Sequence, residues 1–225
     1  PKEMMAKLTS AWARPLRETE VALTHSHRTA WQRVIVAGRP TLILEDDAIL
    51  CASLPEILLE LSLTSGLEFV QLETFNVPKL IGKKRKKLKT LPYSIGRLYR
   101  DRGGAAAYLL WPEAAKKLVH SVKRSYPPAD AALHLAPNII RHQVVEACAI
   151  QAMHMMDICI DSCDWNRISE IAPSSVGVVP KPGYNSWSEW LKYKLRRLSI
   201  STILFRKRLV AVGFAEYRLV QYTGQ

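Results

Sequence analysis

The chain has 225 residues, of which 48% are hydrophobic and 23% are charged. This length and balance are typical of a soluble globular domain and exclude a disordered or fibrous chain. No apolar run reaches the roughly 18 to 20 residues that a membrane-spanning helix needs, so we expect any membrane attachment to be peripheral. The four cysteines are too few for a disulfide framework, and we expect free thiols in a reducing compartment.

The net charge of +12 is concentrated in two short stretches. Residues 79–89 contain seven Lys and Arg residues without an acidic one, and residues 192–208 contain seven more, again without an acidic one. The rest of the chain has 18 basic residues against 20 acidic ones. The sequence therefore predicts a nearly neutral body with two basic appendages.

Helices and strands alternate along the first third of the chain. Apolar residues at helical spacing, followed by Gly38, predict a helix over Arg17–Ala37. The short apolar run Thr41–Leu44 has no alternation, as expected of a strand covered on both faces. A Leu-rich helix follows between Ser53 and Gly66, and Glu68–Glu73 has the composition of another strand.

The basic stretch 79–89 lacks apolar periodicity, and we expect a solvated loop or a mobile flap there. Ser94–Arg100 and Ala105–Trp111 are predicted strands, and Pro112 begins a predicted helix that continues to Arg124. The alternation of strand and helix predicts an α/β domain with a largely parallel sheet.

The C-terminal part is predicted to be a separate appendage. A Gly- and Pro-rich segment, Val176–Asn185, divides a body of residues 1–175 from a tail of residues 176–225. The last helix begins at Ser186, which stands in capping-box register with Glu189. One stripe of this helix is apolar and the other faces carry Lys and Arg; the stripe contains Trp187, Trp190, Leu191, Leu195 and Leu198. Such a helix suits an anionic membrane surface, or it packs on the body with a solvated basic face.

Three consecutive carboxylates, Glu45, Asp46 and Asp47, come directly after the apolar run Thr41–Leu44. They repel one another unless a cation or hydrogen-bond donors compensate. Ligands bind at the carboxyl ends of strands in α/β sheets, and carboxylates suit Mg²⁺ or Mn²⁺ with a substrate diphosphate. The alternative is a turn whose acids are solvated or cap the next helix.

Four segments, in order, resemble glycosyltransferase family 25, the bacterial lipooligosaccharide galactosyltransferases. Leu23–Leu50 is similar to the core of that family, in which a Ser-His pair and a Trp on a helix precede a strand ending in Glu-Asp-Asp; Ser26, His27, Trp31, Glu45, Asp46 and Asp47 fill these places. Phe69–Phe75, Gly103–Leu118 and Pro127–Asp130 resemble three later segments of the family. The family's first strand has no counterpart before the Ser-His helix, and its Pro and Gln near the end of the sheet have no clear counterpart in Ala149–Asp157.

The resemblance implies an A-type glycosyltransferase fold, which is a Rossmann-like mixed sheet flanked by helices. In this chain the fold would lack the family's first strand, and the basic amphipathic helix would follow the fold. The implied reaction is the transfer of a hexose, galactose from UDP-galactose, to a lipopolysaccharide or lipooligosaccharide acceptor. We expect Mn²⁺ or Mg²⁺ as cofactor and a cytoplasmic location, peripheral at the inner face of the bacterial inner membrane.

The resemblance also assigns roles to residues. Asp47 and Asp46 would bind the metal, Asp130 would be the catalytic base with Asp46 as its rival, and His27, Glu45, Gly103 and Gly104 would contact the donor. Separately from the resemblance, the basic stretch and the basic amphipathic helix predict that the acceptor or an anionic membrane is faced by Lys83, Lys84, Arg85, Trp187, Trp190, Arg196 and Arg197. Each has a structural alternative: His27 as a brace of the acidic loop, the two glycines as a tight turn, and Asp130 as a helix N-cap.

Two other classes of function compete with sugar transfer. A nucleic-acid-binding protein would use the two basic stretches, although no helix-turn-helix, finger or aromatic RNA-reading motif appears, and we expect no nucleic acid among the partners. An inactive family member would dock only on membranes or on other transferases.

Overall fold

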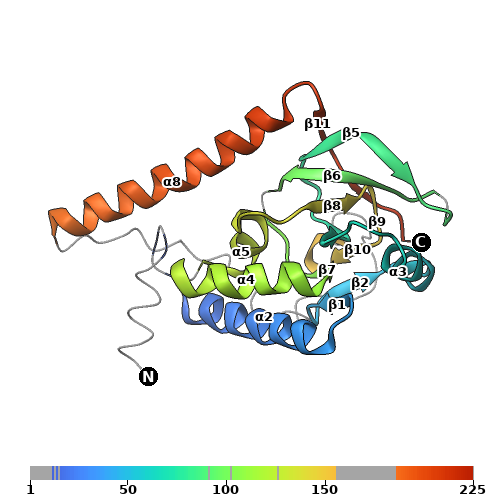
Figure 1. The fold of residues 1–225 in the computed structure, drawn as a ribbon, viewed down its shortest axis with the longest axis horizontal. Coiled ribbons are helices and arrows are strands. Elements are labelled where there is room, and N and C mark those ends of the chain that lie inside the picture. The colour runs from blue at the N-terminus through green and yellow to red at the C-terminus, as the bar shows by residue number, and fades with distance from the viewer. Residues whose placement is uncertain are drawn as a thin grey trace.

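The computed structural model describes residues 12, 14, 16–90, 92–101, 103–125, 127–155 and 186–224 (Figure 1). Cys159, Cys163, the segment Val176–Asn185 and the predicted boundary at residue 175 lie outside these ranges. In chain order, the described helices and strands are α2 (Glu18–Ala37), β1 (Thr41–Leu44), β2 (Ala48–Leu50), α3 (Leu54–Ser62), β3 (Phe69–Gln71), β4 (Glu73–Thr74), β5 (Lys79–Lys87), β6 (Ser94–Arg100), β7 (Ala107–Leu110), α4 (Pro112–Ser125), α5 (Ala129–Leu135), β8 (Arg141–Val144), β9 (Glu146–Ala147), β10 (Ala149–Gln151), α6 (Ala152–Met155), α8 (Trp187–Ala211), β11 (Ala215–Arg218) and β12 (Gln221–Tyr222).

The central sheet has seven strands in the order β1-β7-β3-β8-β6-β5-β11. Only β3 and β8 are parallel neighbours, and the other five pairs are antiparallel. The prediction of a largely parallel sheet was therefore wrong, and the sheet is mixed. The reason lies in the connections, because β5 and β6 are joined by a short turn, which can link only antiparallel strands.

The basic stretch 79–89 is not a loop, as predicted, but contains the nine-residue strand β5. Its first four residues are buried, and β5 pairs with β6 on one side and β11 on the other. Lys79 is fully buried and forms an ion pair with Asp101 over 2.7 Å. The lysines after Gly82 are exposed, so only the second half of the strand carries solvated charge.

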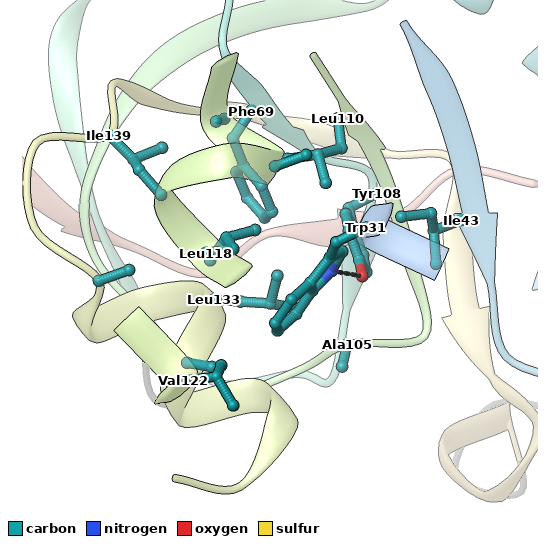
Figure 2. Packing of buried hydrophobic residues seen from close by; sticks show 14 of the residues in the cluster. Trp31, Ile43, Phe69, Ala105, Tyr108, Leu110, Leu118, Val122, Leu133 and Ile139 are labelled. Atoms are coloured by element: carbon teal, nitrogen blue, oxygen red, sulfur yellow. Dashed lines mark hydrogen bonds between the residues drawn. The ribbon is translucent and has the colours of Figure 1, made fainter. Parts of the chain in front are cut away.

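Helices cover both faces of the sheet. On one face α2, α4 and α5 pack on side chains from β1, β3 and β7, and Figure 2 shows this core. Alternate residues of the same strands point to the other face, where α3 packs on them. Tyr108 and Trp31 are both fully buried in the first cluster, joined by a hydrogen bond from Trp31 Nε1 to Tyr108 Oη (2.8 Å; Figure 2).

Helix α5 is fixed at both ends. The buried Arg141 guanidinium donates hydrogen bonds to the carbonyls of Leu133, Ala136 and Ile139 at 2.6 to 3.0 Å, which satisfies groups at the C-terminal end of the helix. At the other end, the Thr24 hydroxyl of α2 donates to the Pro127 carbonyl at 3.2 Å. These contacts hold the first turn of α5 against α2.

Helix α8 begins as predicted, and the Ser186 side chain accepts a hydrogen bond from the Glu189 amide (3.3 Å). Figure 1 shows α8 passing α5 and β6 and extending beyond the body. After it, β11 joins the central sheet and β12 pairs with β9, so these C-terminal strands are built into the sheets of the body. Within the part of the chain that the structure describes, no helix is both long and apolar enough to span a bilayer.

Candidate active site

The three acidic residues lie where the sequence predicts them, at the carboxyl end of β1. The Glu45 amide donates to the Ala106 carbonyl (2.8 Å), and the Ala48 amide donates to the Glu45 carbonyl (3.3 Å), which closes a tight turn. In this turn Asp46 is exposed and Asp47 is 5% exposed. The two aspartates therefore present one carboxylate to solvent and one to the interior.

His27 braces the acidic turn from α2. Its ring is 4% exposed, with Nδ1 at 2.8 Å from Tyr108 Oη and Nε2 at 3.0 Å from Glu45 Oε1. Because the Trp31 indole can only donate to Tyr108, the Tyr108 hydroxyl proton is available for His27 Nδ1, and the proton on Nε2 then points to Glu45. A chain of hydrogen bonds thus runs from Trp31 to Glu45, and the geometry favours His27 as a brace.

Gln151, at the end of β10, connects two of the acids. Its amide nitrogen donates to Glu45 Oε2 at 3.3 Å and to Asp47 Oδ2 at 3.4 Å. The sequence alone did not identify this residue, because its two carboxylate partners lie 106 and 104 positions away along the chain. The signal that could have found it is its place at the end of a short buried strand, as the acidic residues follow β1.

Asp47 has the environment of a carboxylate that needs a cation. Its pKa is raised from the usual value by burial, and further by the charges of Glu45 and Asp46. Its Oδ1 atom is buried and has no hydrogen-bond partner among the described residues. A cation would satisfy this oxygen and relieve the repulsion between the three acids.

The donor set fits Mg²⁺ or Mn²⁺ of the kind that completes its coordination with substrate phosphates. Such a cation needs only one or two protein carboxylates, and Asp46 and Asp47 would be the ones to hold it. A cage made by protein alone is not present in the described part of the chain, where no three His, Cys, Asp or Glu side chains gather closely enough to hold an ion.

A cavity of about 490 Å³ opens beside the acidic turn, between α2 and β1. His27, Glu45 and Asp46 line it together with Ser26 and small or apolar residues of α2. Its size falls within the range of ligand pockets, roughly 300 to 1,000 Å³. The structure therefore brings three of the predicted site residues to the wall of one cavity.

Gly103 and Gly104 lie between two carboxyl groups. A Cβ atom at Gly103 would be 3.3 Å from Asp130 Oδ2, and one at Gly104 would be 2.8 Å from Glu73 Oε1. Gly104 also has φ of +96°, which side-chain-bearing residues rarely adopt. Gly104 therefore has no room for a side chain beside Glu73, whereas a Cβ at Gly103 would require a small shift of the Asp130 carboxylate.

Asp130 lies in the first turn of α5, but it is not the N-cap, which is Pro128. Its Oδ1 accepts a hydrogen bond from the Ala131 amide at 2.7 Å. Burial raises the pKa of Asp130, and the charges of Glu20 and Glu45 raise it further. A carboxylate with a raised pKa is a better proton acceptor, as a general base requires.

Glu73 is a second buried carboxyl, fully removed from solvent. Its Oε1 accepts hydrogen bonds from the Ala106 amide and from Gln71 Nε2, both at 2.8 Å. Burial raises the pKa of Glu73 to about 8, and Glu45 is among the charges that add to the shift, while Lys79 opposes it. The raised pKa favours the protonated form of Glu73 at pH 7, and Gln71 Nε2 links this carboxyl to the Gly104 carbonyl, to which it donates at 3.3 Å.

The remaining predicted residues lie elsewhere. Lys83, Lys84 and Arg85 belong to β5 and line a different cavity. Trp187, Trp190 and Arg197 are exposed on α8. Arg196 is directed to the body, where it donates to the Trp12 carbonyl at 3.2 Å.

The model of glycosyltransferase family 25 (LPS biosynthesis protein) matches residues 2–133, more than half of the chain. The chain belongs to glycosyltransferase family 25. The match includes the acidic turn, His27, the Gly103-Gly104 pair and Asp130. No curated protein sequence matches the chain.

Membership of family 25 makes the protein a glycosyltransferase of lipopolysaccharide biosynthesis, with a nucleotide sugar and an oligosaccharide as its substrates. Gln151 lies beyond the matched residues but contacts the acidic turn inside them. The site of this family 25 protein thus combines the end of β1, in the seven-stranded sheet, with the end of β10, in a separate three-stranded sheet.

Proposed function

We propose that the protein transfers a hexose, galactose from UDP-galactose, to a lipopolysaccharide or lipooligosaccharide acceptor with the assistance of Mn²⁺ or Mg²⁺. The observation that supports this most strongly is the acidic turn after β1, which is braced by His27 and Gln151 and opens on a cavity of ligand size. The mixed sheet with helices on both faces supports an A-type glycosyltransferase fold.

In this proposal the donor occupies the cavity between α2 and β1, with its diphosphate near Asp46 and Asp47. A bound cation would neutralise the charge that develops on the leaving diphosphate. Glu45 does not need to bind the cation, because His27 Nε2 and Gln151 Nε2 already occupy its two oxygens. Its charge instead keeps the site negative and suited to a divalent ion.

Asp130 is the proposed general base. Its carboxylate lies close to Gly103, 3.3 Å from the position that a Cβ atom there would take. The glycines leave room for a sugar to approach the backbone, and Asp130 would accept the proton of the attacking acceptor hydroxyl. Asp46, which is exposed at the cavity, is the alternative base.

We further propose that the protein is cytoplasmic and attaches peripherally to the inner face of the membrane. Helix α8 supports this attachment. The apolar stripe predicted from the sequence points to solvent, with Trp187 72%, Leu195 56% and Leu198 64% exposed. Residues on the opposite side of the helix, including Arg196 and Ile200, face the body at α4 and α5. An outward apolar stripe flanked by cations is the arrangement that binds anionic bilayers.

Isothermal titration of UDP into the full chain, with and without Mn²⁺, tests the proposed donor site. We expect Mn²⁺-dependent binding that Asp46→Asn and Asp47→Asn each weaken at least about tenfold, which corresponds to one lost charge-assisted contact. The control is Glu56→Gln, which also replaces a carboxylate by an amide, but on an exposed face of α3. This variant should bind UDP as the unchanged protein does. Binding that is independent of both the metal and the two aspartates would contradict the assignment.

A further inference from the structure

A second cavity, of about 640 Å³, lies on the face of the sheet that carries α3. Its wall combines strand β5, strand β6, the loop after α3 and the residues that follow α8. Five cationic side chains belong to this wall: Lys83, Lys84, Arg85, Lys86 and Arg97. The cavity is separate from the acidic turn, because it contains none of the residues that line the cavity between α2 and β1.

An irregularity in β5 aims these cations into the cavity. Between Ile81, which pairs with Leu98, and Arg85, which pairs with Gly96, β5 contains two more residues than β6 does. Such a bulge turns side chains away from their regular alternation. A hydrogen bond from the Lys83 amide to the Phe214 carbonyl (2.8 Å) holds the bulge in place.

The positive charge of the cavity is mostly uncompensated. Arg85 forms an ion pair with Glu216, and Arg97 interacts electrostatically with Glu68, but no ion pair among the described residues includes Lys83, Lys84, Lys86 or Arg97. The positive charge of Arg97 also acts on the neighbouring His142. Burial lowers the pKa of His142, and the charge of Arg97 lowers it further, to about 4. An anion in the cavity would relieve this repulsion.

Apolar side chains stand at the rim. Phe214 lines the cavity, although 70% of its side chain is exposed, and Ile95 and Leu67 also belong to the wall. A small polar anion would bind the cations but would bury no apolar surface at the rim. An amphiphile would bind the cations through its anionic group and the apolar rim through its hydrocarbon part.

We infer that the cavity between β5, β6 and Phe214 is a binding site for a phosphate group carried by an amphiphile, with Lys84 and Arg97 as its principal ligands. Lys and Arg bind phosphate through charge-assisted hydrogen bonds, and Arg can bind it with two parallel ones. The inference goes beyond the proposed sugar transfer and does not depend on it. A phosphorylated lipid and a soluble phosphate ester share the chemistry, and the experiment separates them.

Binding is measured on the full chain with two probes. The first is phosphatidylcholine vesicles with and without phosphatidic acid, and the second is glycerol 3-phosphate, the soluble head of the same lipid. No donor is added, so the result is independent of the titration with UDP. We expect phosphatidic acid to strengthen binding to the vesicles; binding of glycerol 3-phosphate as well would show that the phosphate alone suffices.

The double variant Lys84→Gln/Arg97→Gln should weaken the phosphate-dependent binding at least about tenfold. The matched control is Arg33→Gln/Arg39→Gln, which removes two exposed positive charges from the region of α2. Far-ultraviolet circular dichroism and thermal unfolding verify that both variants are folded. Equal loss in both variants, unchanged binding in the cavity variant, or no response of the unchanged protein to either probe would overturn the inference.

Discussion

Replacement of Tyr108 by Phe tests the hydrogen-bond chain that positions the acidic turn. The Tyr108 hydroxyl accepts from Trp31 Nε1 and contacts His27 Nδ1, each at 2.8 Å, and both Trp31 and Tyr108 are fully buried. Phe keeps the aromatic ring, so the packing on Phe69 is preserved. The change therefore removes one oxygen and leaves two buried polar nitrogens without a partner.

Each buried polar group that loses its partner costs about 1 to 3 kcal/mol, so we expect Tyr108→Phe to lower the free energy of unfolding by roughly 2 to 6 kcal/mol. For a chain of this size each kcal/mol lowers the melting temperature by about 2 to 4 °C. Urea unfolding followed by circular dichroism measures the loss. As a control, Tyr217→Phe removes a hydroxyl from an exposed side chain that accepts from Arg208, and it should change stability by less than about 0.5 kcal/mol. A loss below about 1 kcal/mol for Tyr108→Phe would refute the hydrogen-bond chain.

Three further changes test other buried groups. Lys79→Met leaves the Asp101 carboxylate buried without its cation, so it should lower the free energy of unfolding by about 3 to 5 kcal/mol, measured with denaturant. The double variant Lys79→Met/Asp101→Leu, which removes both charges, should restore most of this loss. Glu73 has a folded pKa raised to about 8, so its contribution to stability is complete below its unfolded value near 4.5 and is lost as pH rises toward 8. Glu73→Gln should therefore flatten the fall in unfolding free energy between pH 5 and pH 8, which is at most about 1.4 kcal/mol per pH unit for one group; an unchanged slope would contradict the raised pKa. Gly104→Ala places a Cβ 2.8 Å from Glu73 Oε1 and should lower the melting temperature, whereas Gly66→Ala, also at positive φ but in open space, should lower it less.

The acidic turn and the elements around it could be predicted from the sequence because their signals are local. The apolar run Thr41–Leu44 and the three acids after it are contiguous, and Gly38 ends α2 in the left-handed conformation that Gly favours. The strand Ser94–Arg100 was predicted with its observed bounds. In each case a few neighbouring residues determine the structure.

The errors concern residues whose environment is made by distant parts of the chain. Lys79 looks solvated in a run of lysines, yet Asp101 and Gln143, which lie far along the sequence, bury and pair it. The direction of β7 and the pairing of β11 with β5 depend on such contacts as well. Gln151 was missed for the same reason, because its role appears only when β10 brings it to Glu45 and Asp47.

The measurement that tests the central proposal most directly is the release of UDP from UDP-galactose in the presence of Mn²⁺ and deacylated lipooligosaccharide. We predict acceptor-dependent release, and a loss of about 10² to 10⁴-fold in rate for Asp130→Asn while that variant still binds UDP normally. Glu113→Gln, an exposed carboxylate on α4, should react at the unchanged rate. If Asp130→Asn released UDP as fast as the unchanged protein, Asp130 would not be the base, and if the unchanged protein released none, sugar transfer from UDP-galactose would be contradicted.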